Sequence, residues 1–261
     1  VAGSGSCKDT SLQKGGLLQI RNGGSVENLK WTPGEGKLSL NDGGIVTFDS
    51  SVSGVYYAES GSLVQQSSVM KNQMVSGANV SMFVMDGGSA ENTSAAASGM
   101  IFVYSGGKIS DTKISDSGSM EIYSGGSAEN IKLSAGGKLN VMSGGTALGI
   151  DWTPCIGNLI INSQAYVTYA SQYSGVYLSS DGRNVINSAS ISGAKLDIGN
   201  TMYVMSGGSA NVMLNGGNLT VSSGGKVSLE FNPFNIRDIK AASCKIGRYQ
   251  YMTTSIAEFI K

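Results

Sequence analysis

Paired glycines recur along this chain at a fixed interval of 19 residues. The pairs begin at Gly87, Gly106, Gly125 and Gly144, and a second series, Gly99, Gly118 and Gly137, keeps the same interval. Each unit therefore has two glycine corners, and the segments between corners are long enough only for short strands. A repeat of this length is typical of one coil of a β-solenoid.

Aligning the units places apolar residues in columns. The clearest columns are Met82, Ile101, Met120 and Leu139; Val84, Val103, Ile122 and Val141; Ala90, Ile109, Ala128 and Ala147; and Ala95, Ile114 and Leu133. Residues two apart lie on one face of a strand, and no single unit could bury its own apolar face, so the units must stack. With the right-handed preference of parallel crossovers, the columns predict an all-β, right-handed parallel β-helix of about 19 residues per coil.

A polar column follows one of the apolar columns. Its members are Asn92, Asp111 and Asn130. Short polar side chains suit a corner, where they bond to backbone or to the same position in the next coil. The column predicts a corner ladder with a structural role.

A longer duplication lies above the 19-residue repeat, because Trp31-Thr32-Pro33 recurs 121 residues later as Trp152-Thr153-Pro154. We predict a single β-helix over residues 1–230, made of one 121-residue block and most of a second. Its predicted parts are regular coils at 78–150 and 194–230 and irregular coils at 31–77 and 152–193. Residues 231–261 are predicted to form a C-terminal cap or to begin a further module.

The tryptophans and prolines of the duplicated motif need an explanation, since they lie where the regular rhythm breaks. We expect Trp31, Pro33, Trp152 and Pro154 to anchor the irregular coils against the core. Ligand binding is the alternative for these residues.

An outward column of large side chains precedes the glycine pairs. Its members are Met85, Tyr104, Tyr123 and Met142, with Phe102 two residues earlier in its coil and Tyr203 in a later coil. Exposed aromatic side chains in a row can stack on sugar rings or meet a like stripe on another rod. We expect this stripe to be a binding surface, with cover by a neighbouring loop as the alternative.

The composition excludes several classes of function. The chain has 18 basic and 18 acidic residues and no histidine, so no basic surface for nucleic acid and no histidine-based catalytic or metal site is expected. No apolar run approaches the roughly 20 residues of a membrane helix, and we expect no direct membrane insertion. The three cysteines, Cys7, Cys155 and Cys244, allow at most one internal disulfide, and all three pairings stay open. We predict no cofactor and no metal.

Residues 124–145 run Ser-Gly-Gly, a small residue, Asn, an aliphatic strand, a second Gly-Gly and an aliphatic-x-aliphatic strand. This pattern resembles the passenger repeat of the self-associating autotransporter adhesins, of the type of the adhesin involved in diffuse adherence. Three copies fall within residues 87–145, and weaker copies lie at 15–29 and 207–225. The Trp-Thr-Pro blocks lie outside the common repeat.

The resemblance implies a passenger displayed on a bacterial cell surface or released outside the cell, mediating cell adhesion, self-association or biofilm formation. The implied partners are a host-cell glycan or protein receptor, or like chains on neighbouring cells. In some members a heptosyltransferase modifies Ser and Thr.

The residues themselves favour a non-catalytic protein, because they offer no acid, base, metal or cofactor constellation. The alternative is a polysaccharide-degrading β-helix enzyme of the depolymerase or tailspike type, which would use carboxylates such as Asp111 and Glu121.

Overall fold

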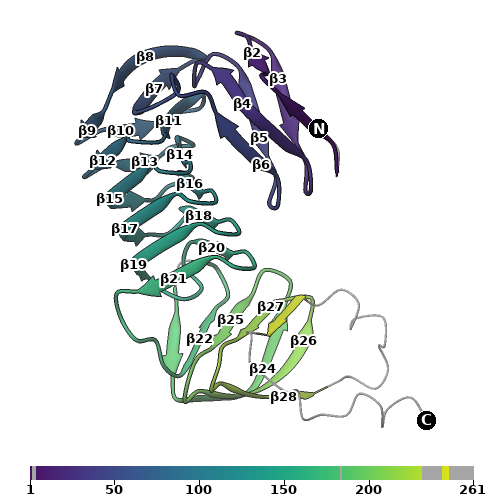
Figure 1. Cartoon of the computed structure of the whole chain (residues 1–261). Helices are drawn as coiled ribbons and strands as arrows, with labels where there is room; N and C mark the ends of the chain where they lie inside the picture. The colour runs from purple at the N-terminus through teal and green to yellow at the C-terminus, as the bar shows by residue number, and fades with distance from the viewer. Residues whose placement is uncertain (2–3, 183, 231–242, 247–261) are drawn as a thin grey trace. The chain divides into compact units, whose positions relative to one another are not determined.

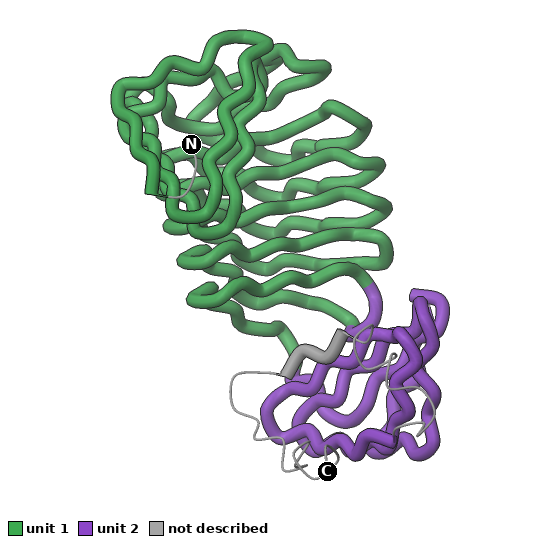
Figure 2. Tube along the Cα trace, turned by 90° about the vertical axis from the view of Figure 1, so that its right-hand side faces the viewer, with its two compact units in different colours: residues 1–153, 157–171 green, residues 154–156, 172–261 purple. Residues whose placement is uncertain are grey.

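The computed structural model describes residues 1, 4–182, 184–230 and, for the backbone alone, 243–246 of the 261. All elements assigned within these residues are β-strands, and none of them is a helix that could cross a membrane. The chain divides into two compact units, coloured separately in Figure 2: residues 1–153 with 157–171, and residues 154–156 with 172 onward. The predicted cap at 231–261 lies outside the described residues, apart from strand β29.

The first unit begins with three short coils, called here the N-terminal stack (residues 6–48). Their strands are β1 (Ser6–Lys8), β2 (Ser11–Leu12), β3 (Leu17–Ile20), β4 (Ser25–Trp31), β5 (Lys37–Leu40) and β6 (Ile45–Phe48). β3 pairs with β5 in parallel, and β4 pairs in parallel with β1, β2 and β6. The inward-facing side chains of this stack are mostly aliphatic, with Trp31 at the end of β4.

The chain then reverses direction. β7 (Val55–Glu59) and β8 (Ser62–Ser67) form an antiparallel hairpin, and β7 also pairs antiparallel with β11 (Val80–Val84). This reversal occupies the second half of the predicted irregular coil at 31–77. It explains the loss of the 19-residue rhythm, because an antiparallel strand cannot belong to a continuing series of parallel coils.

The remainder of the first unit is the main stack (residues 69–169), visible as successive rungs in Figures 1 and 2. One of its sheets continues from β11 through β14 (Met100–Val103), β16 (Ser119–Ile122), β18 (Lys138–Val141) and β20 (Asn158–Ile161). The other contains β9 (Val69–Lys71), β10 (Met74–Ser76), β12 (Ser89–Glu91), β13 (Ser94–Ala96), β15 (Lys108–Ile114), β17 (Ser127–Leu133), β19 (Thr146–Trp152) and β21 (Tyr166–Tyr169).

The register of the main stack matches the predicted columns. Met82 pairs with Ile101, Ile101 with Met120, and Met120 with Leu139, each 19 residues on. All four side chains are fully buried. The prediction of an all-β parallel β-helix with about 19 residues per coil is confirmed.

The two glycines of a corner are required for different reasons, as the pair Gly106-Gly107 illustrates. The Gly107 N–H donates to the Tyr104 carbonyl (2.9 Å) and Gly106 has φ +76°, which is the left-handed third position of a type II turn. A Cβ on Gly107 would lie 2.3 Å from the Val84 carbonyl oxygen of the preceding coil. The first glycine therefore provides the turn and the second lets neighbouring coils approach.

The long strands bend in the middle, and the bend changes which residues face inward. In β15, Asp111 has φ +53°, and the buried residues are Ile109, Thr112 and Ile114, spaced three and then two apart. A simple period of two therefore misses one core column, namely Thr93, Thr112, Ile131 and Ile150, all of them buried. The Thr93 and Thr112 hydroxyls satisfy each other inside the core at 3.2 Å.

The second unit repeats this design on a smaller scale. Its strands are β22 (Val176–Ser179), β23 (Ile186–Ser188), β24 (Ser190–Asp197), β25 (Thr201–Val204), β26 (Ser209–Asn215), β27 (Asn218–Val221), β28 (Lys226–Glu230) and β29 (Ser243–Ile246). β22 pairs antiparallel with β23 and β25, whereas β24–β26–β28 and β25–β27–β29 are parallel. The pairing of Val176 with Val204 corresponds to that of Val55 with Val84 in the first unit. A separate core forms around Leu196, Met202 and Leu219.

Candidate functional site

The outward stripe of large side chains exists, but it is not at the surface. Tyr104 is 2% exposed and Tyr123 6%, and Met85 and Met142 are also buried. The two tyrosine rings are stacked, with their centroids 4.7 Å apart and their planes within 10°. The expectation that Tyr104 and Tyr123 are exposed for binding is therefore wrong, and the alternative of internal cover holds.

The cover is the N-terminal stack, which lies beside the main stack in both ribbon views (Figures 1 and 2). Phe48 meets Tyr104 edge-on at 5.2 Å, and Trp31 meets Phe83 edge-on at 5.3 Å. These rings belong to one buried cluster that joins the core of the N-terminal stack to the stripe. Removing apolar surface from water at about 25 cal/mol per Å² favours this contact for both partners.

Polar contacts fix the same interface at its far end. The Asp42 carboxylate accepts hydrogen bonds from the Ser143 backbone N–H at 2.8 Å and from the Ser143 hydroxyl at 3.0 Å. Asp42 lies in the turn between β5 and β6, and Ser143 lies at a glycine corner of the main stack. A charged acceptor with two donors makes a hydrogen-bonded contact stronger than a neutral pair.

The remaining members of the predicted stripe are only partly covered. Phe102 is half-buried and stacks on Phe83 at 5.2 Å, and Tyr203 is half-buried in the second unit. The Tyr123 hydroxyl donates to the Glu121 carboxylate at 2.6 Å, and burial raises the pKa of both Tyr104 and Tyr123 above the ordinary value. Both phenols therefore stay neutral at physiological pH.

The duplicated tryptophans are buried in similar surroundings. Trp31 is 6% exposed and stacks on Phe48, with their centroids at 6.2 Å, while Trp152 is 3% exposed and stacks on Tyr169 at 6.0 Å. Pro33 and Pro154 are buried as well. This packing favours the anchoring role over ligand binding for all four residues.

The corner column forms a ladder at the bends of the long strands. Asn92, Asp111 and Asn130 all have positive φ, between 49° and 53°. The Asn130 amide donates to the Asp111 carboxylate at 3.2 Å, and the Asn92 amide donates to the Asn72 side-chain oxygen at 2.6 Å. Asn and Asp tolerate the left-handed conformation better than other residues with a side chain.

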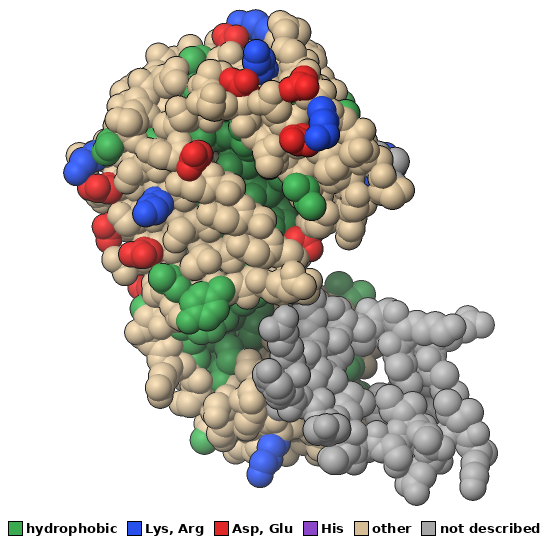
Figure 3. Space-filling model, in the orientation of Figure 1, with side chains coloured by type: hydrophobic (Ala, Val, Ile, Leu, Met, Phe, Trp, Pro, Cys, Tyr) green, Lys and Arg blue, Asp and Glu red, His purple; other side chains and the backbone are tan. Residues whose placement is uncertain are grey.

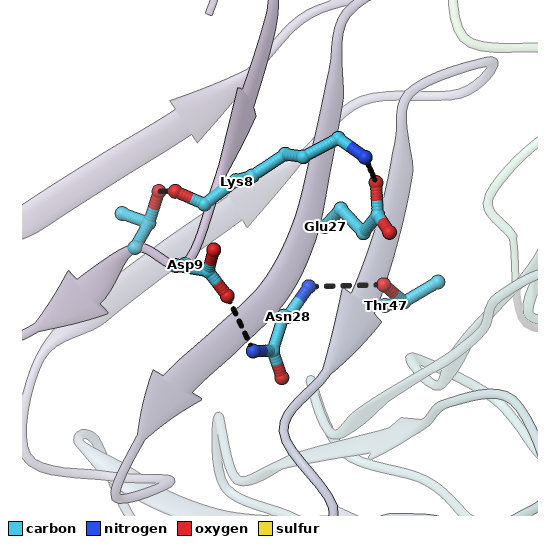
Figure 4. Close-up of polar contacts among 6 residues, drawn as sticks. Lys8, Asp9, Glu27, Asn28 and Thr47 are labelled. Atoms are coloured by element: carbon cyan, nitrogen blue, oxygen red, sulfur yellow. Dashed lines mark hydrogen bonds and ion pairs between the residues drawn. The ribbon is translucent and has the colours of Figure 1, made fainter.

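The same corner of the N-terminal stack carries a more elaborate polar cluster, shown in Figure 4. Asn28 donates from its amide to the Asp9 carboxylate at 2.6 Å and from its backbone N–H to the Thr47 hydroxyl at 3.1 Å. Beside it, Lys8 and Glu27 form an ion pair at 2.6 Å, and the hydrogen bond to Glu27, followed by its charge, raises the Lys8 pKa. The cluster borders a shallow hollow of about 450 Å³. Because these polar groups satisfy one another, the cluster is a ladder of the same kind.

A second hollow, of about 380 Å³, lies between the N-terminal stack and the β7–β8 hairpin. Its lining includes Trp31, Tyr56 and the charged residues Lys14, Lys30 and Glu35. It lies at the interruption that follows the first Trp-Thr-Pro motif. We call it the Trp31 cleft.

The carboxylates considered for catalysis have structural partners. Asp111 accepts from Asn130, and Glu121 accepts from Tyr123. In the part of the chain that the structure describes, no group of three or more His, Cys, Asp and Glu side chains could hold a metal ion. Over the face in Figure 3, acidic and basic side chains are interspersed and form no patch of one sign.

The cysteines provide no reactive centre among the residues whose side chains are described. Cys7 and Cys155 are free thiols. Burial raises the pKa of the Cys155 thiol to about 12, and its Sγ lies 3.2 Å from the Thr201 carbonyl oxygen. The side chain of Cys244 lies outside the described residues.

Comparison with known proteins adds little to this geometry. No protein-family model matches the sequence, and no curated protein matches it either. Among solved structures, the chain is similar to a crystal structure of a TibC-catalysed, hyper-glycosylated fragment of TibA, with 21% sequence identity and a TM-score of 0.27. The match covers 94% of this chain and 85% of that one. A likeness at this level supports no statement about what this chain binds.

Proposed function

We propose that this chain is a non-catalytic adhesive passenger, displayed on a bacterial cell surface or released outside the cell. Its role is cell adhesion, self-association or biofilm formation. The observation that carries the proposal is the use of the chain: regular coils build a rigid scaffold whose outward columns bear short polar and charged side chains. One such column is Ser89, Lys108, Ser127 and Thr146, in register on successive coils.

The resemblance of residues 87–145 to adhesin passenger repeats supports the same proposal. The partners that follow are a host-cell glycan or protein, or like chains on neighbouring cells. A heptosyltransferase that modifies Ser and Thr is a further proposed partner, and the exposed corner residues Ser105 and Ser124 are accessible acceptors. The carboxylates each have a structural role, so no observation favours the polysaccharide-degrading alternative.

Display of the full chain on a bacterial strain without adhesins of its own tests the proposal. We expect faster sedimentation of the culture, or greater attachment to epithelial cells, than with the same strain displaying an unrelated β-solenoid of similar length. A folded, displayed chain that leaves both sedimentation and attachment at the control level would contradict it. Mass spectrometry after co-expression with a heptosyltransferase tests the modification separately.

A further inference from the structure

The Trp31 cleft has the composition of a site for a small hydroxylated ligand. Its lining combines the amide side chains of Gln13 and Gln66 with the charged groups of Lys14, Lys30 and Glu35. Amide, carboxylate and ammonium groups together offer both donors and acceptors, which is what a sugar ring with several hydroxyls requires. A volume of about 380 Å³ lies at the small end of the usual range for ligand sites, about 300–1000 Å³.

The wall of the cleft is rigid. Trp31 and Tyr56 are more than nine-tenths buried, and both belong to the cluster that joins the N-terminal stack to the main stack. Tyr56 lies on β7 and Trp31 at the end of β4, so two elements that pack tightly hold the polar groups in place. Such preorganisation lowers the entropy that a ligand must lose on binding.

One lysine in the cleft has its charge available for a ligand. Lys14 donates to the Ser62 hydroxyl at 3.2 Å and lies 3.8 Å from Glu35. Lys30 Nζ, in contrast, lies 4.0 Å from the Asp49 carboxylate, which accepts hydrogen bonds from the backbone and the hydroxyl of Ser51. The hydrogen bonds to Ser51, more than the charge of Lys30, lower the pKa of Asp49. The Lys30 ammonium is therefore the group in the cleft that can take up an anion.

The internal duplication shows that the scaffold does not need these charges. Trp31 and Tyr56 recur 121 residues later as Trp152 and Tyr177. The charged positions do not recur: Lys14, Lys30 and Glu35 correspond to Ala135, Asp151 and Ile156. Residues kept in both blocks serve the packing, whereas the charges belong to the first block alone.

We propose that the Trp31 cleft binds a short saccharide carrying a carboxylate, with Lys30 pairing with the carboxylate and Gln13, Gln66 and Glu35 meeting the hydroxyls. The inference names a ligand class for the proposed adhesive function and rests on it only for its biological setting. Binding itself is a property of the purified chain.

Calorimetry on the purified full chain tests the proposal with two probes, a glucuronic acid-terminated disaccharide and its neutral glucose-terminated counterpart. We expect the acidic probe to bind at least about tenfold more tightly, and added salt to weaken it. Lys30→Gln should lower the affinity for the acidic probe by at least about tenfold, while Lys30→Arg retains most of it. Circular dichroism checks that each variant is folded.

Lys132→Gln is the matched control. Lys132 also lies 4.0 Å from a carboxylate, that of Asp151, and is 65% exposed, against 66% for Lys30, but it stands outside the cleft. Equal affinity for the two probes, no binding of either, or equal effects of Lys30→Gln and Lys132→Gln would each overturn the proposal. Displayed cells that still aggregate in that event would leave the adhesive function standing, whereas binding without aggregation would remove the adhesive function alone.

Discussion

The main stack and the N-terminal stack are built from the same 19-residue unit, yet they bury their apolar side chains differently. Ile101, Met120 and Leu139 are fully covered by the coils before and after their own. The three coils of the N-terminal stack instead share a cluster with side chains on the outside of the main stack. A repeat of this kind is stable only where neighbours cover both ends, so a short stack needs lateral cover.

The difference also explains why large side chains stand on the outside of otherwise plain coils. Tyr104 and Tyr123 are not required by the coil, since their position can hold Met in the coils on either side. They supply the surface against which Phe48 and Trp31 pack. The same side chains would be costly on a rod with nothing beside it.

The largest effect is expected from Tyr104→Ala, which removes the ring at the centre of the contact. Loss of a buried aromatic side chain costs about 3–5 kcal/mol. We expect proteolysis of residues 6–48 to become fast while residues 82–145 stay protected, as read by mass spectrometry of the fragments. Tyr166→Ala is the control, because Tyr166 is 61% exposed and its loss should change the stability by less than about 0.5 kcal/mol. Equal protection of both stacks in the Tyr104 variant would show that the N-terminal stack stands alone.

A smaller effect is expected from Asp42→Ala, which removes the polar end of the same contact. Ser143 would lose the acceptor for its backbone N–H and for its hydroxyl, at a cost of about 1–3 kcal/mol in the free energy of unfolding. Urea denaturation measures this loss. Asp151→Ala should give a far smaller change, since Asp151 is exposed and makes only a 4.0 Å ion pair with Lys132. Similar losses for the two variants would contradict the role assigned to Asp42.

The smallest effect is expected within the main stack, at the corner ladder. Asn130→Ala places an alanine at φ +53° and removes the bond to Asp111, for a loss of about 1–2 kcal/mol. Asn130→Gly should cost less, because glycine already holds the same corner one coil later, at Gly149 with φ +63°. Thermal unfolding of the two variants ranks them, and a glycine variant less stable than the alanine variant would show that the backbone conformation is not the main requirement.

Much of the main stack could be predicted from the sequence, because its determinants repeat. The glycine pairs and the columns through Met82 and Val84 recur in every coil and identify both the strands and their register. The column through Thr112 could not be found by alternation alone, because the left-handed residue Asp111 shifts the inward positions by one. The signal for it is the Asn or Asp before each member of the column.

The fate of the aromatic stripe could not be predicted from periodicity, which describes one coil and its neighbours. Whether Tyr104 lies at a surface depends on residues such as Phe48, more than 50 positions away in a different stack. Both outward aromatics and covered aromatics give the same pattern. The reversal at β7 was visible only as a break in rhythm, since nothing in a 19-residue period specifies an antiparallel strand.

The bond between Asp42 and Ser143 joins residues 101 positions apart, and this separation has a consequence for how the chain is made. A chain synthesised from its N-terminus at about 5–20 residues per second would wait about 5–20 s between the two partners. Over that time the first coils are present without the surface that covers them, and closing so long a loop is slow compared with stacking one coil on the last. The part of the molecule that emerges first is thus among the last to be completed, and it depends on other factors to keep its apolar side chains from associating elsewhere in the meantime.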